Sequence, residues 1–142
     1  MRQKCMVKLC GLRTSEDVAV AAELGVWAVG FVLTTSKRRI TMQECRRLCA
    51  LVPAGILKVG VFTKERPEDI IYACRECGLD LAQIHGDRSP EDWGKLSSVP
   101  VLRAFSVKGR ESLSEVGGSG QKRFLLDAYV KGMAGGTGVS FD

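Results

Sequence analysis

Aromatic side chains and long apolar runs are both scarce in this sequence. Phe, Trp and Tyr make up 6% of the 142 residues, and the basic residues are scattered, with Lys37 to Arg39 as the only run of three. A face that binds nucleic acid usually carries a denser basic stripe with aromatics for base stacking. No apolar run approaches the roughly 18 residues of a membrane span, and no signal-peptide core follows Met1 to Lys4. We therefore expect no nucleic-acid partner, no membrane association and a cytoplasmic location.

The overall composition is that of a globular protein with one packed core. Hydrophobic residues make up 45% of the chain and charged residues 26%, which are ordinary proportions for a soluble domain. A length of 142 residues is enough for one core but not for two, so residues 1–142 are predicted to form a single domain. The net charge of +5 is a moderate excess that favours a small anionic substrate as partner.

The six cysteines are interpreted as reduced thiols, because nothing in the sequence marks the chain for secretion. Cys74 and Cys77 have the spacing of a zinc-ligand pair, and Cys45 and Cys49 lie one helical turn apart. Both pairs fall in segments with helical periodicity, whereas zinc knuckles place such pairs on tight turns. We therefore expect buried thiols on helices and no metal site.

Short apolar runs alternate with amphipathic segments along the whole chain. The pattern predicts strands over residues 6–10, 26–32, 57–62, 81–84, 101–105 and 123–127. It predicts helices over residues 14–24, 41–51, 67–77, 90–96 and 111–116. Six strands and five helices joined by short loops indicate consecutive parallel βα units. Such units build either an open doubly wound sheet or an arc of a (β/α)8 barrel, and periodicity alone favours neither.

In both architectures ligands bind at the carboxyl ends of the strands. The residues at these ends are Cys10 with Gly11, residues 31–39, Thr63, His85 with Gly86, Ser106 and Asp127. This set combines a thiol, a basic cluster, the only histidine and a carboxylate. We therefore expect the functional site at this edge of the sheet.

Three residues of this edge each have two interpretations. Lys8 and Cys10 share a face of one strand, so the ammonium favours Cys10 as a base or nucleophile; the other interpretation is a buried small hydrophobe. Asp127 is either a general acid or base, or a cap of the following loop. Arg38 either pairs with a substrate carboxylate or belongs to a solvated charge run.

Two further features stay open at this point. Gln83 and His85 share a face of the fourth strand, and His85 is either a hydrogen-bonding group of the edge or a strand-end histidine with a local partner. The cluster Gly135-Gly-Thr-Gly138 is similar to a phosphate-binding loop, but such loops work through a following helix N-terminus. We expect a lid or an exposed tail there.

Six motifs occur in a specific order: Val7-Lys-Leu-Cys-Gly11, Ala28-Val-Gly-Phe-Val32 with Ser36-Lys-Arg38, Lys58-Val-Gly-Val-Phe62, Gln83-Ile-His-Gly86, Phe124-Leu-Leu-Asp127, and Gly135-Gly-Thr-Gly138 with Phe141-Asp142. In this order the chain resembles the phosphoribosylanthranilate isomerases of tryptophan biosynthesis. The resemblance implies a (β/α)8 TIM barrel. It also implies an Amadori rearrangement of N-(5-phosphoribosyl)anthranilate to 1-(2-carboxyphenylamino)-1-deoxyribulose 5-phosphate, without metal or cofactor.

The resemblance implies a role for each matching residue. Cys10 corresponds to the general base that removes the proton from ribose C2, and Asp127 to the general acid that protonates the ring oxygen. Ring opening requires both transfers, so an acid and a base must face each other across the substrate. Arg38 corresponds to the arginine that holds the anthranilate carboxylate. Gln83 and His85 match a motif that lines the substrate site.

The resemblance also implies an incomplete barrel of about six strands and five helices, because Phe141 and Asp142 correspond to the start of the sixth helix. Strands seven and eight, whose loops usually grip phosphate, then lie outside this sequence. We expect self-association or complementation through the free edges of the first and sixth strands, and little activity from the chain alone. The alternatives are a truncated barrel fragment without catalysis and a flavodoxin-like open sheet that binds an anion.

Overall fold

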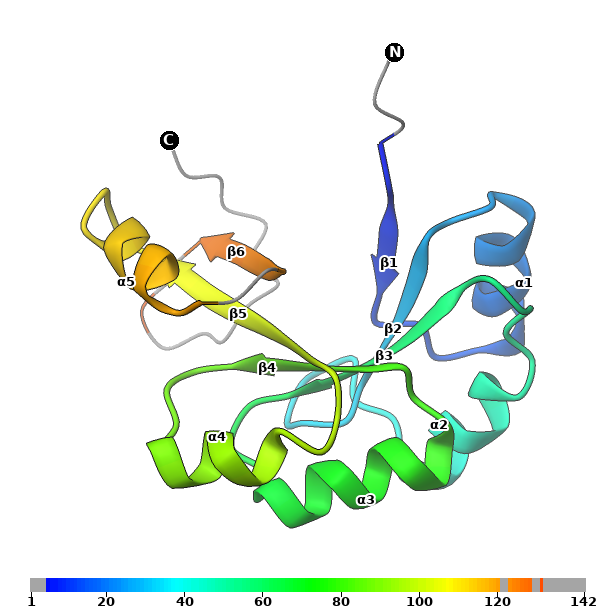
Figure 1. Cartoon of the computed structure of the whole chain (residues 1–142). Helices are drawn as coiled ribbons and strands as arrows, with labels where there is room; N and C mark the ends of the chain where they lie inside the picture. The colour runs from blue at the N-terminus through cyan, green and yellow to red at the C-terminus, as the bar shows by residue number, and fades with distance from the viewer. Residues whose placement is uncertain (1–4, 121–122, 129–130, 132–142) are drawn as a thin grey trace.

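The computed structural model describes residues 5–120, 123–128 and 131, and shows one curved sheet with helices on its outer side (Figure 1). The strands are β1 (Lys8–Cys10), β2 (Ala28–Val32), β3 (Leu57–Phe62), β4 (Leu81–His85), β5 (Val101–Val107) and β6 (Phe124–Ala128). The helices are α1 (Ser15–Glu23), α2 (Met42–Cys49), α3 (Pro67–Cys77), α4 (Pro90–Leu96) and α5 (Ser112–Gly118).

The order of the strands decides between the two predicted architectures. All neighbouring strands are parallel, and the spatial order β1-β2-β3-β4-β5-β6 is the order in the sequence. A doubly wound sheet reverses its strand order at a switch point, and no reversal occurs among the described strands. The prediction of an arc of a (β/α)8 barrel is therefore confirmed, and the flavodoxin-like alternative is wrong.

The helix ends follow the sequence signals closely. The Thr14 side chain accepts a hydrogen bond from the Asp17 backbone N–H at 3.1 Å, and the Asp17 carboxylate accepts one from the Thr14 N–H at 3.0 Å. This reciprocal pair satisfies two of the free N–H groups at the start of α1. Gly78 ends α3 with a φ of 65°, a left-handed conformation that costs glycine little.

Five of the six strands differ from their predicted ranges by one or two residues; β4 ends at His85, and β6 spans Phe124–Ala128. β2 begins at Ala28 rather than residue 26, because the Val26 N–H is hydrogen-bonded to the last turn of α1 at 3.4 Å. β5 extends to Val107 because that residue pairs with Ala128 of β6. β1 begins only at Lys8, although the carbonyl before it still accepts a hydrogen bond from Trp27 at 2.9 Å.

The core lies between the convex face of the sheet and the helices. Phe31 of β2 and Ile84 of β4 are fully buried there, against Leu48 of α2 and Ile70 of α3. Alternate residues of each strand point the other way, toward the concave face. Because the convex face and the helices bury one another, the concave face is left for a ligand.

Four cysteines belong to the helical part of this core. Cys45, Cys49, Cys74 and Cys77 are buried free thiols of α2 and α3, as their periodicity predicted. Burial raises the pKa of Cys74 to about 11, so its thiol is uncharged at neutral pH. Among the described residues, no group of three or more His, Cys, Asp or Glu side chains could hold a metal ion.

The two outer strands have free edges within the described part of the chain. There, β1 pairs only with β2, and β6 pairs only with β5. Apolar side chains stand exposed beside both edges, with Met6 67% and Phe124 43% accessible. No helix among the described residues is long and apolar enough to cross a membrane.

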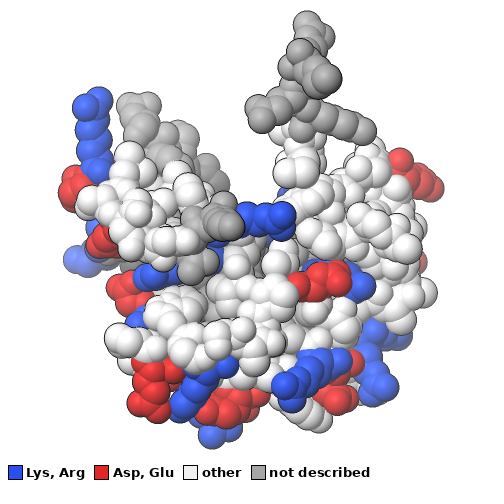
Figure 2. Space-filling view, in the orientation of Figure 1, with Lys and Arg blue, Asp and Glu red and all other residues white. Residues whose placement is uncertain are grey.

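The charges of the outer helices are mixed in sign. On the face seen in Figure 2, Lys and Arg side chains alternate with Asp and Glu over the helices at the bottom of the view. Ion pairs such as Lys95 with Glu91, at 3.1 Å, join some of them. The absence of a nucleic-acid partner stays a prediction.

Candidate active site

A cavity of about 350 Å³ lies on the concave face, near the carboxyl ends of the strands. The five residues predicted to form the site all line it: Cys10, Arg38, Gln83, His85 and Asp127. They come from β1, the loop after β2, β4 and β6. The parallel sheet therefore brings together side chains that are up to 117 positions apart in the sequence, since Cys10 and Asp127 are at opposite ends of the arc.

The position of the Cys10 thiol depends on a glycine on the neighbouring strand. Cys10 pairs with Gly30 in the β1–β2 ladder. A Cβ atom at Gly30 would lie 2.7 Å from Cys10 Sγ and 3.2 Å from Cys10 Cα. Glycine at this position therefore leaves the space that the thiol occupies. Lys8 lines the same cavity, as expected for a residue two positions before Cys10 on the strand.

Arg38 lies across the turn that follows β1. Its Nη1 donates a hydrogen bond to the Cys10 carbonyl oxygen at 3.3 Å. A Cβ atom at Gly11 would lie 2.8 Å from Arg38 Cδ, and Gly11 also has a φ of +89°. Both the close approach and the left-handed backbone favour glycine at this position. The guanidinium is thus held at the mouth of the cavity, next to the strand that carries the thiol.

Gln83 and His85 form a pair on the wall of the cavity. Gln83 is only 4% exposed, and its Nε2 lies 2.9 Å from His85 Nε2. Burial lowers the pKa of His85; the Asp127 carboxylate acts against this shift, and the Lys8 ammonium adds to it. The imidazole is therefore neutral at neutral pH, with a carboxylate and an ammonium close enough to influence it.

A set of hydrogen bonds along the rim was not predicted. The Thr34 and Thr63 hydroxyl groups lie 2.5 Å apart, which links the loops after β2 and β3. Arg88, in the loop after β4, donates to the carbonyl oxygens of Thr63 at 2.8 Å and Glu65 at 2.9 Å. Three consecutive loops are thereby joined beside the cavity. Hydroxyl residues directly after strands were the only sequence signal for this arrangement.

Ser106 is the strand-end residue that the structure places elsewhere. It is exposed and lines a separate hollow, together with Arg103 and Lys108. Ser106 pairs with Asp127 of β6, so it lies next to the cavity without lining it. The glycine cluster at 135–138 and Asp142 lie outside the described residues.

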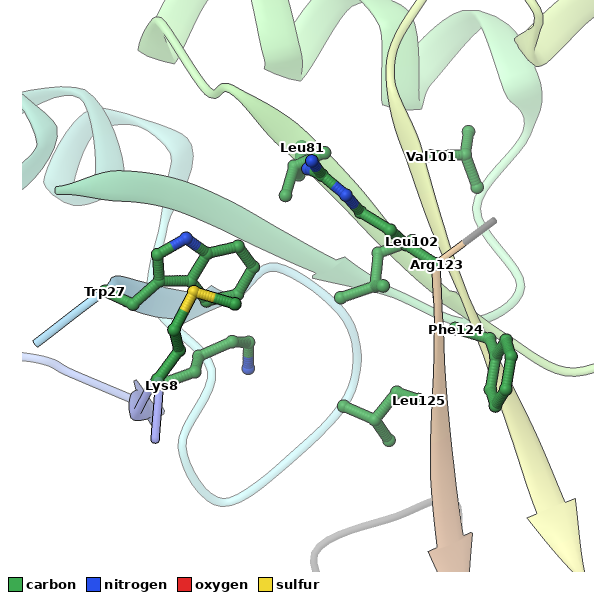
Figure 3. Close-up of a pocket in the computed structure, with 9 residues that line it drawn as sticks. Lys8, Trp27, Leu81, Val101, Leu102, Arg123, Phe124 and Leu125 are labelled. Carbon is green, nitrogen blue, oxygen red and sulfur yellow. The ribbon is translucent and has the colours of Figure 1, made fainter. Parts of the chain in front are cut away.

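Another hollow, of about 540 Å³, lies at the amino ends of the strands (Figure 3). Its lining includes the first residues of four strands, Lys8, Leu81, Val101 and Phe124. Lys8 and Arg123 carry the only charges among the nine lining residues. Its lining contains no carboxylate, thiol or imidazole, so the cavity lined by Cys10 and Asp127 is the better candidate for proton-transfer chemistry.

Comparison with known proteins gives a consistent result. A model of the family described as N-(5'-phosphoribosyl)anthranilate (PRA) isomerase matches residues 7–142. An N-(5'-phosphoribosyl)anthranilate isomerase of Rubrobacter xylanophilus is 41% identical over 140 residues, which cover 96% of this chain and 68% of that protein. One from Listeria monocytogenes is 36% identical over 137 residues, covering 96% and 67%.

Solved structures are similar as well. Phosphoribosyl anthranilate isomerase from Thermotoga maritima superposes with a TM-score of 0.85 at 30% identity, covering 92% of this chain and 64% of that one. A phosphoribosyl anthranilate isomerase in complex with reduced 1-(o-carboxyphenylamino)-1-deoxyribulose 5-phosphate gives a TM-score of 0.83 at 31% identity, covering 89% and 66%. The chain thus spans about two thirds of the length of the relatives it matches.

The contact between Gly30 and Cys10 predicts the effect of one added methyl group. Gly30→Ala is expected to destabilise the chain by about 1–3 kcal/mol, the usual cost of overpacking, because the new Cβ would meet Cys10 Sγ at 2.7 Å. The midpoint of urea unfolding measures this loss. In a Cys10→Ala background the cost of Gly30→Ala should be smaller, because the sulfur is gone.

Gly94→Ala is the matched control for this change. Gly94 lies inside α4 with open space around its Cβ position, so alanine there should raise stability by up to about 1 kcal/mol. An equal cost of Gly30→Ala with and without the Cys10 sulfur would contradict the assigned contact.

The lowered pKa of His85 predicts a loss of stability in weak acid. Below the ordinary value of 6.5 the unfolded chain takes up a proton at this imidazole before the folded chain does, so stability falls as the pH falls. Urea midpoints between about pH 7 and pH 5 should therefore decline. Since His85 is the only histidine, His85→Asn should flatten this decline. Parallel declines in both proteins would show that the imidazole titrates normally.

Proposed function

Because the chain belongs to the N-(5'-phosphoribosyl)anthranilate isomerase family, we propose that its cavity catalyses the Amadori rearrangement of N-(5'-phosphoribosyl)anthranilate when the barrel is complete. The product is 1-(2-carboxyphenylamino)-1-deoxyribulose 5-phosphate, in tryptophan biosynthesis. The observation that carries the proposal is a single cavity lined by Cys10 from one end of the arc and Asp127 from the other. The proposed site of action is the cytoplasm.

The proposed reaction moves protons and leaves no net oxidation. Asp127 gives a proton to the ring oxygen as the C1–O bond breaks, and the lone pair of the amine nitrogen forms a C=N bond to C1. Cys10 then removes the proton from C2, and the electrons of that C–H bond form a C1=C2 bond while the nitrogen regains its pair. The resulting enol becomes the ketone as C1 gains a proton and the C2 hydroxyl group loses one. Because every step is a proton transfer or its consequence, the reaction requires no cofactor.

The charges around the cavity support an anionic substrate. Arg38 presents a guanidinium at the mouth, where it is proposed to hold the anthranilate carboxylate through paired hydrogen bonds. Lys8 adds a second positive charge to the lining. Gln83 and His85 supply neutral polar groups on the wall and are proposed to contact the substrate.

The free edges of β1 and β6 are proposed to be covered by further polypeptide. About one third of the length of these relatives lies outside the matched region, which is room for additional βα units. The hollow at the amino ends is lined mainly by apolar side chains, and Met6 and Phe124 are exposed beside it. Burying such surface is favourable, so we propose that a second polypeptide complements the chain. Without that polypeptide, we propose that copies of the chain associate with one another.

Substitution of the acid and the base tests the catalytic proposal in a complemented protein. This protein is the chain co-expressed with the part of the Rubrobacter xylanophilus relative that lies beyond the matched region. Cys10→Ala and Asp127→Asn should each lower kcat by about 100- to 10,000-fold, the usual contribution of a general acid or base. Binding of reduced 1-(o-carboxyphenylamino)-1-deoxyribulose 5-phosphate should change by only a few-fold.

Cys5→Ser is the matched control, since Cys5 is an exposed thiol outside the cavity lining, and it should retain full activity. Retention of activity by Cys10→Ala would refute the assigned base. If the variants instead lost their helical circular dichroism, the two residues would have structural roles.

Rescue of a tryptophan auxotroph that lacks this isomerase tests the need for further polypeptide. The chain alone should fail to rescue growth, and co-expression with the remaining third of the relative should restore it. Sedimentation at micromolar concentration should show association of the chain alone and a single 1:1 species with its complement. Rescue by the chain alone, together with a compact monomer, would overturn the proposal.

A further inference from the structure

The hydrogen bond between Gln83 and His85 bears on which nitrogen of the imidazole carries the proton. It joins Gln83 Nε2 to His85 Nε2 at 2.9 Å, so both of its atoms are nitrogen. An amide nitrogen carries two hydrogens and accepts no hydrogen bond, whereas an imidazole nitrogen accepts one when it is unprotonated. Gln83 is therefore the donor and His85 Nε2 is the acceptor. An imidazole with Nε2 as acceptor carries its proton on Nδ1 and is neutral.

The surroundings of Gln83 hold it in place for this role. Gln83 lies in the middle of β4, where it pairs with Val61 of β3 and Leu102 of β5. It is 4% exposed, so its backbone and most of its side chain have little freedom to move. His85 is two residues further along the same strand, on the same face. The donor, Gln83, is thus fixed within the sheet, and the acceptor, His85, lies at the carboxyl end of β4.

The other end of the Gln83 amide is unsatisfied. Gln83 Oε1 is buried and has no hydrogen-bond partner among the described residues. A buried acceptor without a partner is unfavourable, because it has lost its hydrogen bonds to water. Because Gln83 lines the cavity, a hydroxyl or N–H group of a ligand can supply the missing donor. Such a donor would favour the same amide orientation, with its nitrogen toward His85.

Three charged groups influence whether the imidazole is protonated. Asp127 of β6 favours a protonated imidazole, while Lys8 of β1 opposes it. Arg38, in the loop after β2, lines the same cavity with a further positive charge. Protonation of His85 at Nε2 would also replace the Gln83 hydrogen bond with two facing N–H groups. The amide therefore adds a geometric restriction that the charges alone do not provide.

We propose that Gln83 is a positioning residue that holds His85 as the neutral Nδ1–H tautomer. His85 then acts toward a ligand as a hydrogen-bond donor through Nδ1, and its Nε2 is not available as a proton acceptor. This assignment concerns the chain's own side chains and does not depend on the proposed reaction. If that reaction takes place here, the consequence is that His85 does not compete with Cys10 for the substrate proton.

The single histidine makes a spectroscopic test direct. In the chain labelled with 15N, a long-range 1H–15N correlation spectrum contains one imidazole, and the two nitrogen shifts report which one carries the proton. At pH 7 the wild-type chain should show protonated Nδ1 and unprotonated Nε2. Protonated Nε2 in the wild-type chain would overturn the proposal by itself, whatever the variants do.

Gln83→Glu is the informative variant, because it replaces the N–H donor with a carboxylate acceptor. Nε2 should become protonated, and the pKa of His85 should rise by at least about one pH unit beside the new charge. Gln43→Glu, on the exposed surface of α2, makes the same chemical change elsewhere and should leave the tautomer unchanged.

The backbone amide spectrum would show whether Gln83→Glu is folded, and a second variant tests the proposal if it is not. Gln83→Leu removes the donor without adding charge, and should release His85 to a mixture of tautomers. A pure Nδ1–H tautomer in folded Gln83→Leu would show that another group holds the imidazole, and would also overturn the proposal. None of these measurements requires catalytic activity, so they succeed or fail independently of the proposed function.

Discussion

The parallel register between neighbouring strands is the constraint on which the candidate site depends. Because every strand runs in the same direction, all carboxyl ends lie at one edge, and the side chains there come from both ends of the sequence. The pairing of Cys10 with Gly30 shows how narrow this constraint is. A shift of β1 by one residue would turn Lys8 and Cys10 from the concave face toward the core. It would also replace Cys10 opposite Gly30 with Leu9 or Gly11, depending on the direction of the shift.

Small residues shape the cavity as much as the reactive ones do. Gly30 leaves room for the Cys10 sulfur, and Gly11 lets the stem of Arg38 cross the turn after β1. The thiol and the guanidinium are therefore positioned from the same two segments, and Arg38 is bonded to the Cys10 carbonyl oxygen. A side chain at Gly30 would meet the thiol, and a side chain at Gly11 would meet the stem of Arg38, although neither glycine is proposed to take part in proton transfer.

Local sequence signals predicted the elements well, because each signal has a local physical cause. The Thr14 cap and the Gly78 stop satisfy or release backbone groups within a few residues, and they were confirmed. The strand-end rule found Cys10 and Asp127, because parallel βα units leave only one edge for ligands. The arc could not be distinguished from a doubly wound sheet, since strand order depends on pairing between distant segments. The contacts of Arg88 with Thr63 and Glu65 were missed for the same reason.

The cavity contains more titratable groups than the proposed reaction needs, and this has a chemical consequence. The rearrangement requires one group that gives a proton to oxygen and one that takes a proton from carbon. A third group that titrated in the same pH range would place a variable charge beside the proposed acid and the proposed base. His85 occupies that intermediate place, since it lines the cavity with both Cys10 and Asp127. Burial and Lys8 disfavour its protonation, and in the proposed tautomer the Gln83 amide engages Nε2, the nitrogen that would otherwise accept a proton. With the imidazole neutral, as proposed, the charge between the proposed acid and the proposed base stays the same while two proton transfers proceed within one small cavity.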